Sequence, residues 1–202
     1  MWVLLPTAGL VWLVLGTWGL VRLATRPPAV SLGAALAHGR PTDPGDVGCT
    51  WAETMLRTND GINMPMWCID GGDTAGPTIV DLHDWGRSPV AQLRDLVDIA
   101  KDARTVILPT LRGHAQGTGR CSLGPRETAD LRVLLATLSG DIVLQGTGLG
   151  GLVVQACRNE PNVIDVRLDE PWADQGDGLK RILKSRGQVA FPFASLARIC
   201  LP

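Results

Sequence analysis

The residues best able to do chemistry stand at 146–151, where the sequence reads GTGLGG. The apolar stretch DIVLQ at 141–145 precedes them and a helix-forming stretch follows, which predicts a sharp turn from a strand into a helix. Such a turn can present a nucleophile in the pattern G-x-S-x-G, whose outer glycines match Gly146 and Gly150. The nucleophile position is then Gly148, which has no side chain.

The same six residues also fit the dinucleotide-binding pattern G-x-G-x-x-G through Gly146, Gly148 and Gly151. In that pattern an acidic residue about 20 positions further on holds a ribose hydroxyl. Asp165 and Asp169 follow Gly146 by 19 and 23 residues. A dinucleotide fingerprint normally opens the first β-α-β unit of a domain, whereas other elements come first here. The order of elements therefore favours the nucleophile turn, and a nucleotide-binding protein using GTGLGG is an alternative.

The elements that must position this turn are predicted from hydrophobic periodicity. Two extended runs, 51–58 and 63–70, flank an Asn-Asp-Gly-Ile turn, and Asp-Gly between extended runs is typical of a hairpin. Alternating elements follow, with strands predicted at 78–83, 105–109, 141–145 and 163–168 and helices at 89–101, 127–138 and 149–158. A hairpin followed by alternating β and α units indicates an α/β fold, in which helices cover both faces of a mostly parallel sheet.

Three other turns carry sequences that, together with this bend, resemble one family. Residues 82–86 (LHDWG) resemble the H-G-x-x loop after the third strand of α/β-hydrolases, and residues 111–117 (LRGHAQG) resemble the D-x-R-G-H-G-x-S loop after their fourth strand. GPRE at 124–127, followed by Asp130, resembles the G-x-x-E-x-x-D start of the next helix. The resemblance covers residues 51 to about 171 and is closest to the serine aminopeptidase and lysophospholipase-like branch.

This resemblance implies a mechanism in which a serine attacks, a histidine moves its proton and an acid orients the histidine. The serine position is Gly148, and no histidine follows His114, although the base should follow the last strand. Asp169, Glu170 and Asp174 follow the sixth strand, where some family members carry the acid, but they have no imidazole to orient. We therefore expect no intact catalytic residue, and a hydrolase-like protein without hydrolase activity.

The resemblance assigns the oxyanion hole, the pair of N–H groups that holds developing negative charge, to the backbones of Leu149 and Trp85. The glycine that the family carries after His83 is Asp84 here, and a carboxylate near the hole would oppose negative charge. His83 and His114 belong to loop motifs in which neither is the general base. An active or split serine-hydrolase-type esterase or peptidase, completed by another chain, is the alternative to inactivity.

Residues 1–23 are predicted to form a single-pass transmembrane anchor. The first 21 residues carry no charged side chain, and about 20 apolar residues at ~1.5 Å each span a hydrocarbon core of ~30 Å. Arg22 and Arg26 follow, which favours the cytoplasmic side for the rest of the chain. Residues 24–48, rich in proline and glycine, are predicted to form a linker, and residues 49–202 the α/β-hydrolase-like domain.

The strand predicted at 163–168 is the last one, and only helical pieces around 178–185 and 193–200 follow it. A complete α/β-hydrolase sheet has eight strands, so the resemblance implies an incomplete domain without the last strands. The final strand would then be an open edge, and open edges invite pairing with another chain. A homodimer through this edge is one expectation; the alternatives are that the helical tail covers the edge or that the chain is a marginal remnant of a longer domain. The N-terminal helix is expected to contact the membrane.

The composition fits a globular domain, with 45% hydrophobic and 19% charged residues and a net charge of -1. Near-neutral charge gives no reason to expect nucleic acid as a partner. The five cysteines are widely spaced and form no CxxC pair, so they predict neither a disulfide framework nor a zinc site. No cofactor and no metal ion is expected.

Overall fold

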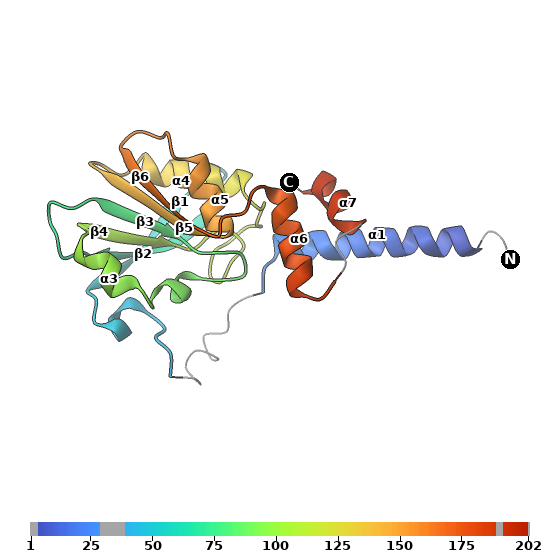
Figure 1. The fold of residues 1–202 in the computed structure, drawn as a ribbon, viewed down its shortest axis with the longest axis horizontal. Helices are drawn as coiled ribbons and strands as arrows, with labels where there is room; N and C mark the ends of the chain where they lie inside the picture. The colour runs from blue at the N-terminus through green and yellow to red at the C-terminus, as the bar shows by residue number, and fades with distance from the viewer. Residues whose placement is uncertain (1–3, 29–38, 189–191, 202) are drawn as a thin grey trace.

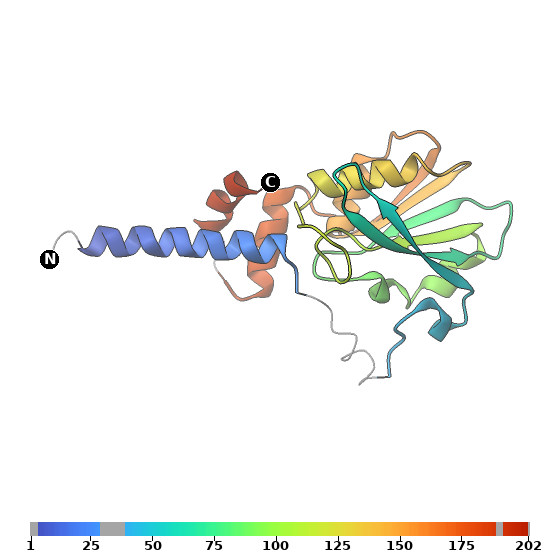
Figure 2. The same ribbon diagram turned by 180° about the vertical axis from the view of Figure 1, so that it is seen from behind.

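A computed structural model describes residues 4–28, 39–188 and 192–201 of the chain. An α/β domain occupies the middle of the sequence (Figure 1). A long helix, α1 (Leu4–Thr25), extends away from this domain beside α6 (Gln175–Ser185) and α7 (Phe193–Cys200), as the view from behind also shows (Figure 2).

The sheet of the α/β domain has six strands in the described part of the chain, in the order β1-β2-β4-β3-β5-β6. The β1–β2 and β2–β4 pairs are antiparallel, and the β3–β4, β3–β5 and β5–β6 pairs are parallel. The mostly parallel sheet predicted from the alternating elements is thereby confirmed. The strands are β1 (Trp51–Arg57), β2 (Asn63–Asp70), β3 (Thr78–Leu82), β4 (Thr105–Pro109), β5 (Ile142–Thr147) and β6 (Val163–Asp169).

Helices cover both faces of the sheet because buried side chains alternate along its central strands. Val80 and Leu144 belong to the core beneath α4 (Pro125–Leu135) and α5 (Leu149–Ala156). Ile79 and Val143, one position earlier, belong to the core beneath α3 (Leu96–Lys101). Figure 1 shows α4 and α5 on one side of the strands and α3 on the other.

The helix predicted over residues 89–101 forms in two pieces, η2 (Pro89–Gln92) and α3. The N–H of Leu93 donates to the C=O of Val90, three residues back, so the segment begins as a tighter 3₁₀ turn. That turn changes the direction of later side chains, and Val97, expected on the apolar face, is 44% exposed. Leu93 and Leu96 still both reach the core.

The anchor predicted over residues 1–23 is corrected by the structure. Among the described residues, no helix combines the length and the apolar content that crossing a membrane requires. The first three residues of the predicted anchor lie outside the described part of the chain, and α1 continues past its predicted end to Thr25. The single-pass membrane location inferred from that anchor is corrected with it.

The C-terminal end of α1 packs into the α/β domain. Ala24 is fully buried, and its C=O accepts the indole N–H of Trp85 at 3.0 Å. The C=O of Thr25 accepts the backbone N–H of Cys121 at 3.0 Å. These bonds hold the helix end against the two loops that follow β3 and β4.

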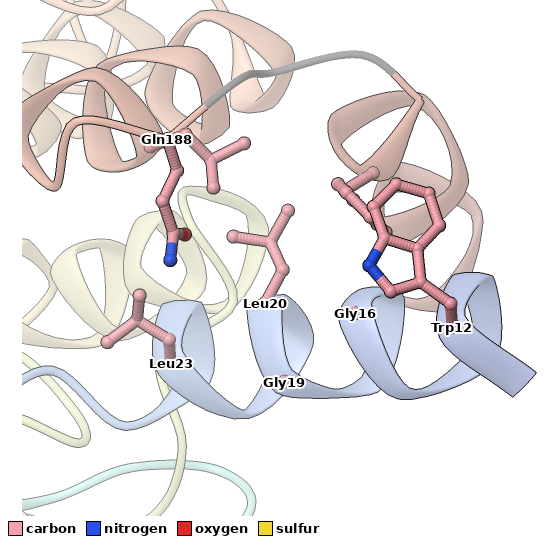
Figure 3. Close-up of a pocket in the computed structure, with 8 residues that line it drawn as sticks. Trp12, Gly16, Gly19, Leu20, Leu23 and Gln188 are labelled. Atoms are coloured by element: carbon pink, nitrogen blue, oxygen red, sulfur yellow. The ribbon is translucent and has the colours of Figure 1, made fainter.

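An apolar cavity of about 730 Å³ lies where α1 meets the C-terminal helices (Figure 3). The rings of Trp12 and Phe193 meet edge to face across it, with centroids 4.7 Å apart. Gly16 permits this approach, because a Cβ there would lie 2.2 Å from the Phe193 ring. Figure 3 shows Leu20, Leu23 and Gln188 around the same space. Helix α1 thus packs one face against the C-terminal helices, whereas Leu10, Leu15 and Trp18 of the same helix are 60–63% exposed.

Strand β6 forms an edge of the sheet and pairs only with β5 among the described strands. Ile164 and Leu168 on this strand are 59% and 41% exposed. The elements after β6 pack against α1 instead of extending the sheet. Pairing of this edge with a second copy of the chain stays a prediction.

Candidate functional site

The bend between β5 and α5 has the strained backbone of a nucleophile turn. Gly148 has φ 55° and ψ -113°, a conformation that side chains disfavour and glycine tolerates. The outer glycines are needed for close packing. A Cβ on Gly146 would lie 2.5 Å from the carbonyl carbon of Gly150, and a Cβ on Gly150 would lie 2.2 Å from the C=O oxygen of Leu82. The structure therefore places both outer glycines where β3, β5 and α5 meet.

The backbone N–H groups of Leu149 and Trp85, predicted as oxyanion-hole donors, converge on one atom. Each donates to Oδ1 of Asp84, and both N···O distances are 2.7 Å. This distance is typical of charge-assisted hydrogen bonds and of donors placed around an oxyanion. The carboxylate of Asp84 therefore occupies the position at which a developing oxyanion would be held.

The same carboxylate fills the space that a nucleophile would need. A Cβ built on Gly148 would lie 1.9 Å from Oδ1 and 2.6 Å from Oδ2 of Asp84. Carboxylate and side chain cannot occupy this space together, so Asp84 fits because residue 148 is glycine. The sequence indicated only that Asp84 would oppose negative charge; no sequence pattern signalled that it binds the two donors itself.

The environment of Asp84 shifts the pKa of its carboxyl group. Burial raises the pKa of this carboxyl above its ordinary value. The hydrogen bonds from Leu149 and Trp85 and the charges of Arg87 and Arg181 oppose that rise. The ionised form of Asp84 is thus disfavoured by burial and stabilised by the two backbone N–H groups that it binds.

His83 and His114 lie against each other, with ring centroids 5.0 Å apart, and both are buried. The N–H of Leu111 donates to Nε2 of His83 at 3.1 Å, so the proton of this ring is on Nδ1, which donates to the C=O of Asp84 at 2.8 Å. Burial, with a contribution from His114, lowers the pKa of His83 to about 3. Both nitrogens of His83 therefore hold the loop that carries Asp84, and neither can act as a general base.

His114 also has a structural environment. Its Nδ1 lies 3.0 Å from the C=O of Arg112, and its Nε2 is buried without a partner among the described residues. Burial lowers the pKa of His114. This ring stabilises the turn after β4 and does not reach the bend at Gly148 through any described hydrogen bond.

Arg112 connects the loop after β4 to α4 and to the β1–β2 hairpin. Its Nε and Nη2 donate to the two carboxylate oxygens of Asp130 at 2.6 and 2.5 Å, and its Nη1 donates to Asp60 at 3.0 Å. Burial opposes the charge of Arg112, but the two carboxylates raise its pKa. Glu127, at the start of α4, accepts the N–H and the hydroxyl of Ser122. Asp60 had been predicted only as a turn residue.

The acids that the resemblance implied, Asp169, Glu170 and Asp174, are exposed and orient no histidine. The C=O of Asp169 accepts the N–H of Gly148 at 3.1 Å. The carboxylate of Asp174 caps α6 by accepting the N–H of Asp177 at 2.9 Å. Asp169 therefore closes the bend, and Asp174 begins a helix.

The dinucleotide interpretation of GTGLGG gains no support from the geometry. The N–H of Leu149 opens α5 and would face a pyrophosphate in such a site. It donates to Asp84 instead, and phosphate charge beside this carboxylate would be repelled. Asp165, the acid expected to hold a ribose, is exposed and pairs with Arg167 at 3.2 Å.

Asp81 in β3 is a second buried carboxylate near this site and predicts a pH dependence. It is 4% exposed, and its carboxylate accepts a hydrogen bond from Nε2 of Gln145 at 3.5 Å. Burial, with a contribution from the charge of Asp95, raises the pKa of Asp81 to about 6, although the side chain of Gln92 opposes the rise. Its pKa in the unfolded chain is about 3.9. Folding therefore binds a proton between about pH 4 and pH 6, so the free energy of unfolding rises as pH falls from 7 to 4.

Asp81→Asn is expected to stabilise the protein at pH 7.5 by about 1–3 kcal/mol and to remove that rise. Urea denaturation at pH 7.5 and pH 5 measures both effects. The control is Asp141→Asn, which removes an exposed carboxylate directly before β5. It should change neither the free energy of unfolding at pH 7.5 nor its dependence on pH. An unchanged pH profile in Asp81→Asn would contradict the prediction.

Solved structures of several hydrolases share the fold described above. An esterase of Pyrococcus furiosus superposes with a TM-score of 0.66 over 87% of this chain and 68% of its own length, at 20% identity. An α/β hydrolase from Novosphingobium aromaticivorans has a TM-score of 0.51 at 23% identity, covering 58% of this chain and 43% of its own. The thioesterase domain from the curacin biosynthetic pathway has a TM-score of 0.51 at 19% identity, covering 60% and 47%.

These similarities show that the chain has an α/β-hydrolase fold. The sequence matches no protein-family model, and no curated protein matches it either. The chain spans less than half of the length of the α/β hydrolase and of the thioesterase domain.

Proposed function

We propose that this α/β-hydrolase-like protein has lost hydrolase activity and acts by binding. The observation that carries the proposal is the position of Asp84. Its Oδ1 accepts both N–H groups that would stabilise an oxyanion, while Gly148 offers no attacking atom. Loss of the serine or the histidine of a catalytic triad costs on the order of 10⁶ in kcat. Here the hole that would supply residual catalysis is filled as well.

The histidines support the same proposal. No histidine follows His114 in the sequence. His83 uses both ring nitrogens in hydrogen bonds to the backbone, and burial keeps it neutral. A serine introduced at the bend would therefore still have no imidazole to accept its proton.

We also propose that its nearest relatives are in the serine aminopeptidase and lysophospholipase-like branch of the fold. Two of the motifs that suggested this branch are joined in space. Arg112 of the R-G-H loop forms a bidentate ion pair with Asp130 of the following helix. Both side chains are almost fully buried, at 3% and 4% exposure.

The proposal predicts that the purified chain neither hydrolyses p-nitrophenyl butyrate above the uncatalysed rate nor is labelled by a fluorophosphonate probe. An active esterase of the same fold is the positive control for both assays. A saturable burst of p-nitrophenolate, or labelling that survives denaturation, would show an active enzyme. Adding NAD should leave the melting temperature unchanged, and a rise would favour the nucleotide-binding alternative.

A further inference from the structure

A second cavity, of about 380 Å³, lies over the β1–β2 hairpin and away from the bend at Gly148. Trp51 and Glu53 of β1 share one face of the sheet, because alternate residues of a strand point the same way. Glu53 pairs directly with Trp67 of β2. The loops before β1 and after β3 close the space, so it is built by segments far apart in the sequence.

Two indole rings form one side of this cavity. The rings of Trp51 and Trp67 have centroids 5.6 Å apart and planes inclined by 64°. Both residues are only partly buried, so part of their surface faces the cavity. The face of an indole attracts cations within about 6 Å, and angled aromatic rings favour quaternary ammonium groups.

The charges that line the cavity are all negative. Asp43 and Glu53 contribute carboxylates, and none of the described lining residues is a lysine, arginine or histidine. Asp43 accepts the N–H groups of Gly45 and Asp46, which fixes its position beside Trp51. Glu53 has no partner among the described residues and stays free to approach a cation.

Two largely buried residues, Ser88 and Thr110, line the same cavity and carry hydroxyl groups. Ser88 and Thr110 are 5% and 7% exposed. Ser88 is the N-cap residue of η2, yet its side chain makes no capping bond. Neither hydroxyl forms a hydrogen bond with another described residue, and neither is among the fully buried polar atoms without a partner, so both are open to a ligand in the cavity. Their arrangement therefore indicates a polar ligand as well as a cation.

We propose that this cavity binds a small organic cation of the quaternary or methylated ammonium class that also carries a hydroxyl or carbonyl group. The indoles of Trp51 and Trp67 contact the cationic head, and the carboxylates of Asp43 and Glu53 balance its charge. The hydroxyls of Ser88 and Thr110 bind its polar group. The volume lies in the range of small-molecule pockets, about 300–1,000 Å³. The proposal does not depend on whether the bend at Gly148 is catalytic.

Choline and its uncharged analogue 3,3-dimethylbutan-1-ol test the proposal, titrated into the full chain by isothermal titration calorimetry. Choline is expected to bind saturably and at least tenfold more tightly than the uncharged analogue. Trp51→Leu and Glu53→Gln are each expected to weaken choline binding about tenfold. Two controls, Trp18→Leu and Asp141→Asn, change a tryptophan and an acidic residue outside the cavity and should bind as the wild type does.

Equal binding of the two compounds would show an apolar pocket and overturn the proposal. Binding of methyl glucoside in place of choline would show a carbohydrate site and overturn it equally. If Trp51→Leu failed to fold, Glu53→Gln at an exposed position would still decide the outcome, because it changes only the charge. Absence of any choline binding to the folded wild type would contradict the assignment.

Discussion

Gly148→Ser is expected to lower the free energy of unfolding by about 3 kcal/mol, although serine is the residue that the G-x-S-x-G pattern places there. The new Cβ would lie 1.9 Å from Oδ1 of Asp84, so the carboxylate must leave the N–H groups of Leu149 and Trp85. The change therefore adds steric overlap, breaks two charge-assisted hydrogen bonds and puts a side chain at φ 55°. Urea denaturation at pH 7 measures the loss.

Adding Asp84→Gly to the Gly148→Ser variant is expected to restore much of the lost stability, because it removes the carboxylate with which the serine collides. The double-mutant cycle should give a coupling energy of about 2 kcal/mol between positions 84 and 148. Gly148→Ala is the matched control: the overlap begins at Cβ, so alanine should destabilise as much as serine does. Additive effects within about 0.5 kcal/mol would show that the two positions are independent and would refute the described geometry.

This cycle also separates structure from catalysis. The double variant Asp84→Gly, Gly148→Ser would have an open pair of N–H donors and a hydroxyl at the bend. It would still lack a histidine after His114 to take the proton of that hydroxyl. We therefore expect it to fold and to remain unlabelled by the fluorophosphonate probe.

Arg112→Met is expected to destabilise the protein by about 3–5 kcal/mol. Asp130 is 4% exposed and would keep a buried charge without its bidentate partner. Asp60, whose pKa is lowered to about 2 chiefly by its hydrogen bond to Arg112, is 47% exposed and would return to solvent at little cost. Thermal and urea denaturation at pH 7 measure the change.

Arg132→Met is the matched control for this prediction. It removes an arginine from α4, the helix that carries Asp130, and breaks an ion pair in which Arg132 is 52% and Glu160 is 29% exposed. Exposed pairs contribute about 0–1 kcal/mol, so this variant should stay close to the wild type. Similar losses of stability in Arg112→Met and Arg132→Met would show that the buried ion pair of Arg112 with Asp130 contributes no more to stability than an exposed pair does.

The sequence by itself determined most of the sheet. Apolar periodicity predicted β4 at the bounds that the structure shows and the β1–β2 hairpin within one residue. These features depend on local preferences: strands alternate their side chains, and Asp-Gly turns reverse the chain. The α/β-hydrolase fold followed from the order of the loop motifs, because that order fixes which strand ends in the bend at Gly148.

Tertiary structure alone decided what the bend does and where the first helix goes. Asp84 reaches Leu149 across 65 residues, and Arg112 reaches Asp60 across 52. No local pattern encodes such contacts, because they depend on which chain segments the sheet brings together. The same reason explains the C-terminal end of α1: the apolar residues of this helix predicted a membrane anchor, whereas Leu20 and Ala24 are buried against the folded domain and the C-terminal helices. Toward the N-terminus of the helix, Leu10, Leu15 and Trp18 stay more than half exposed.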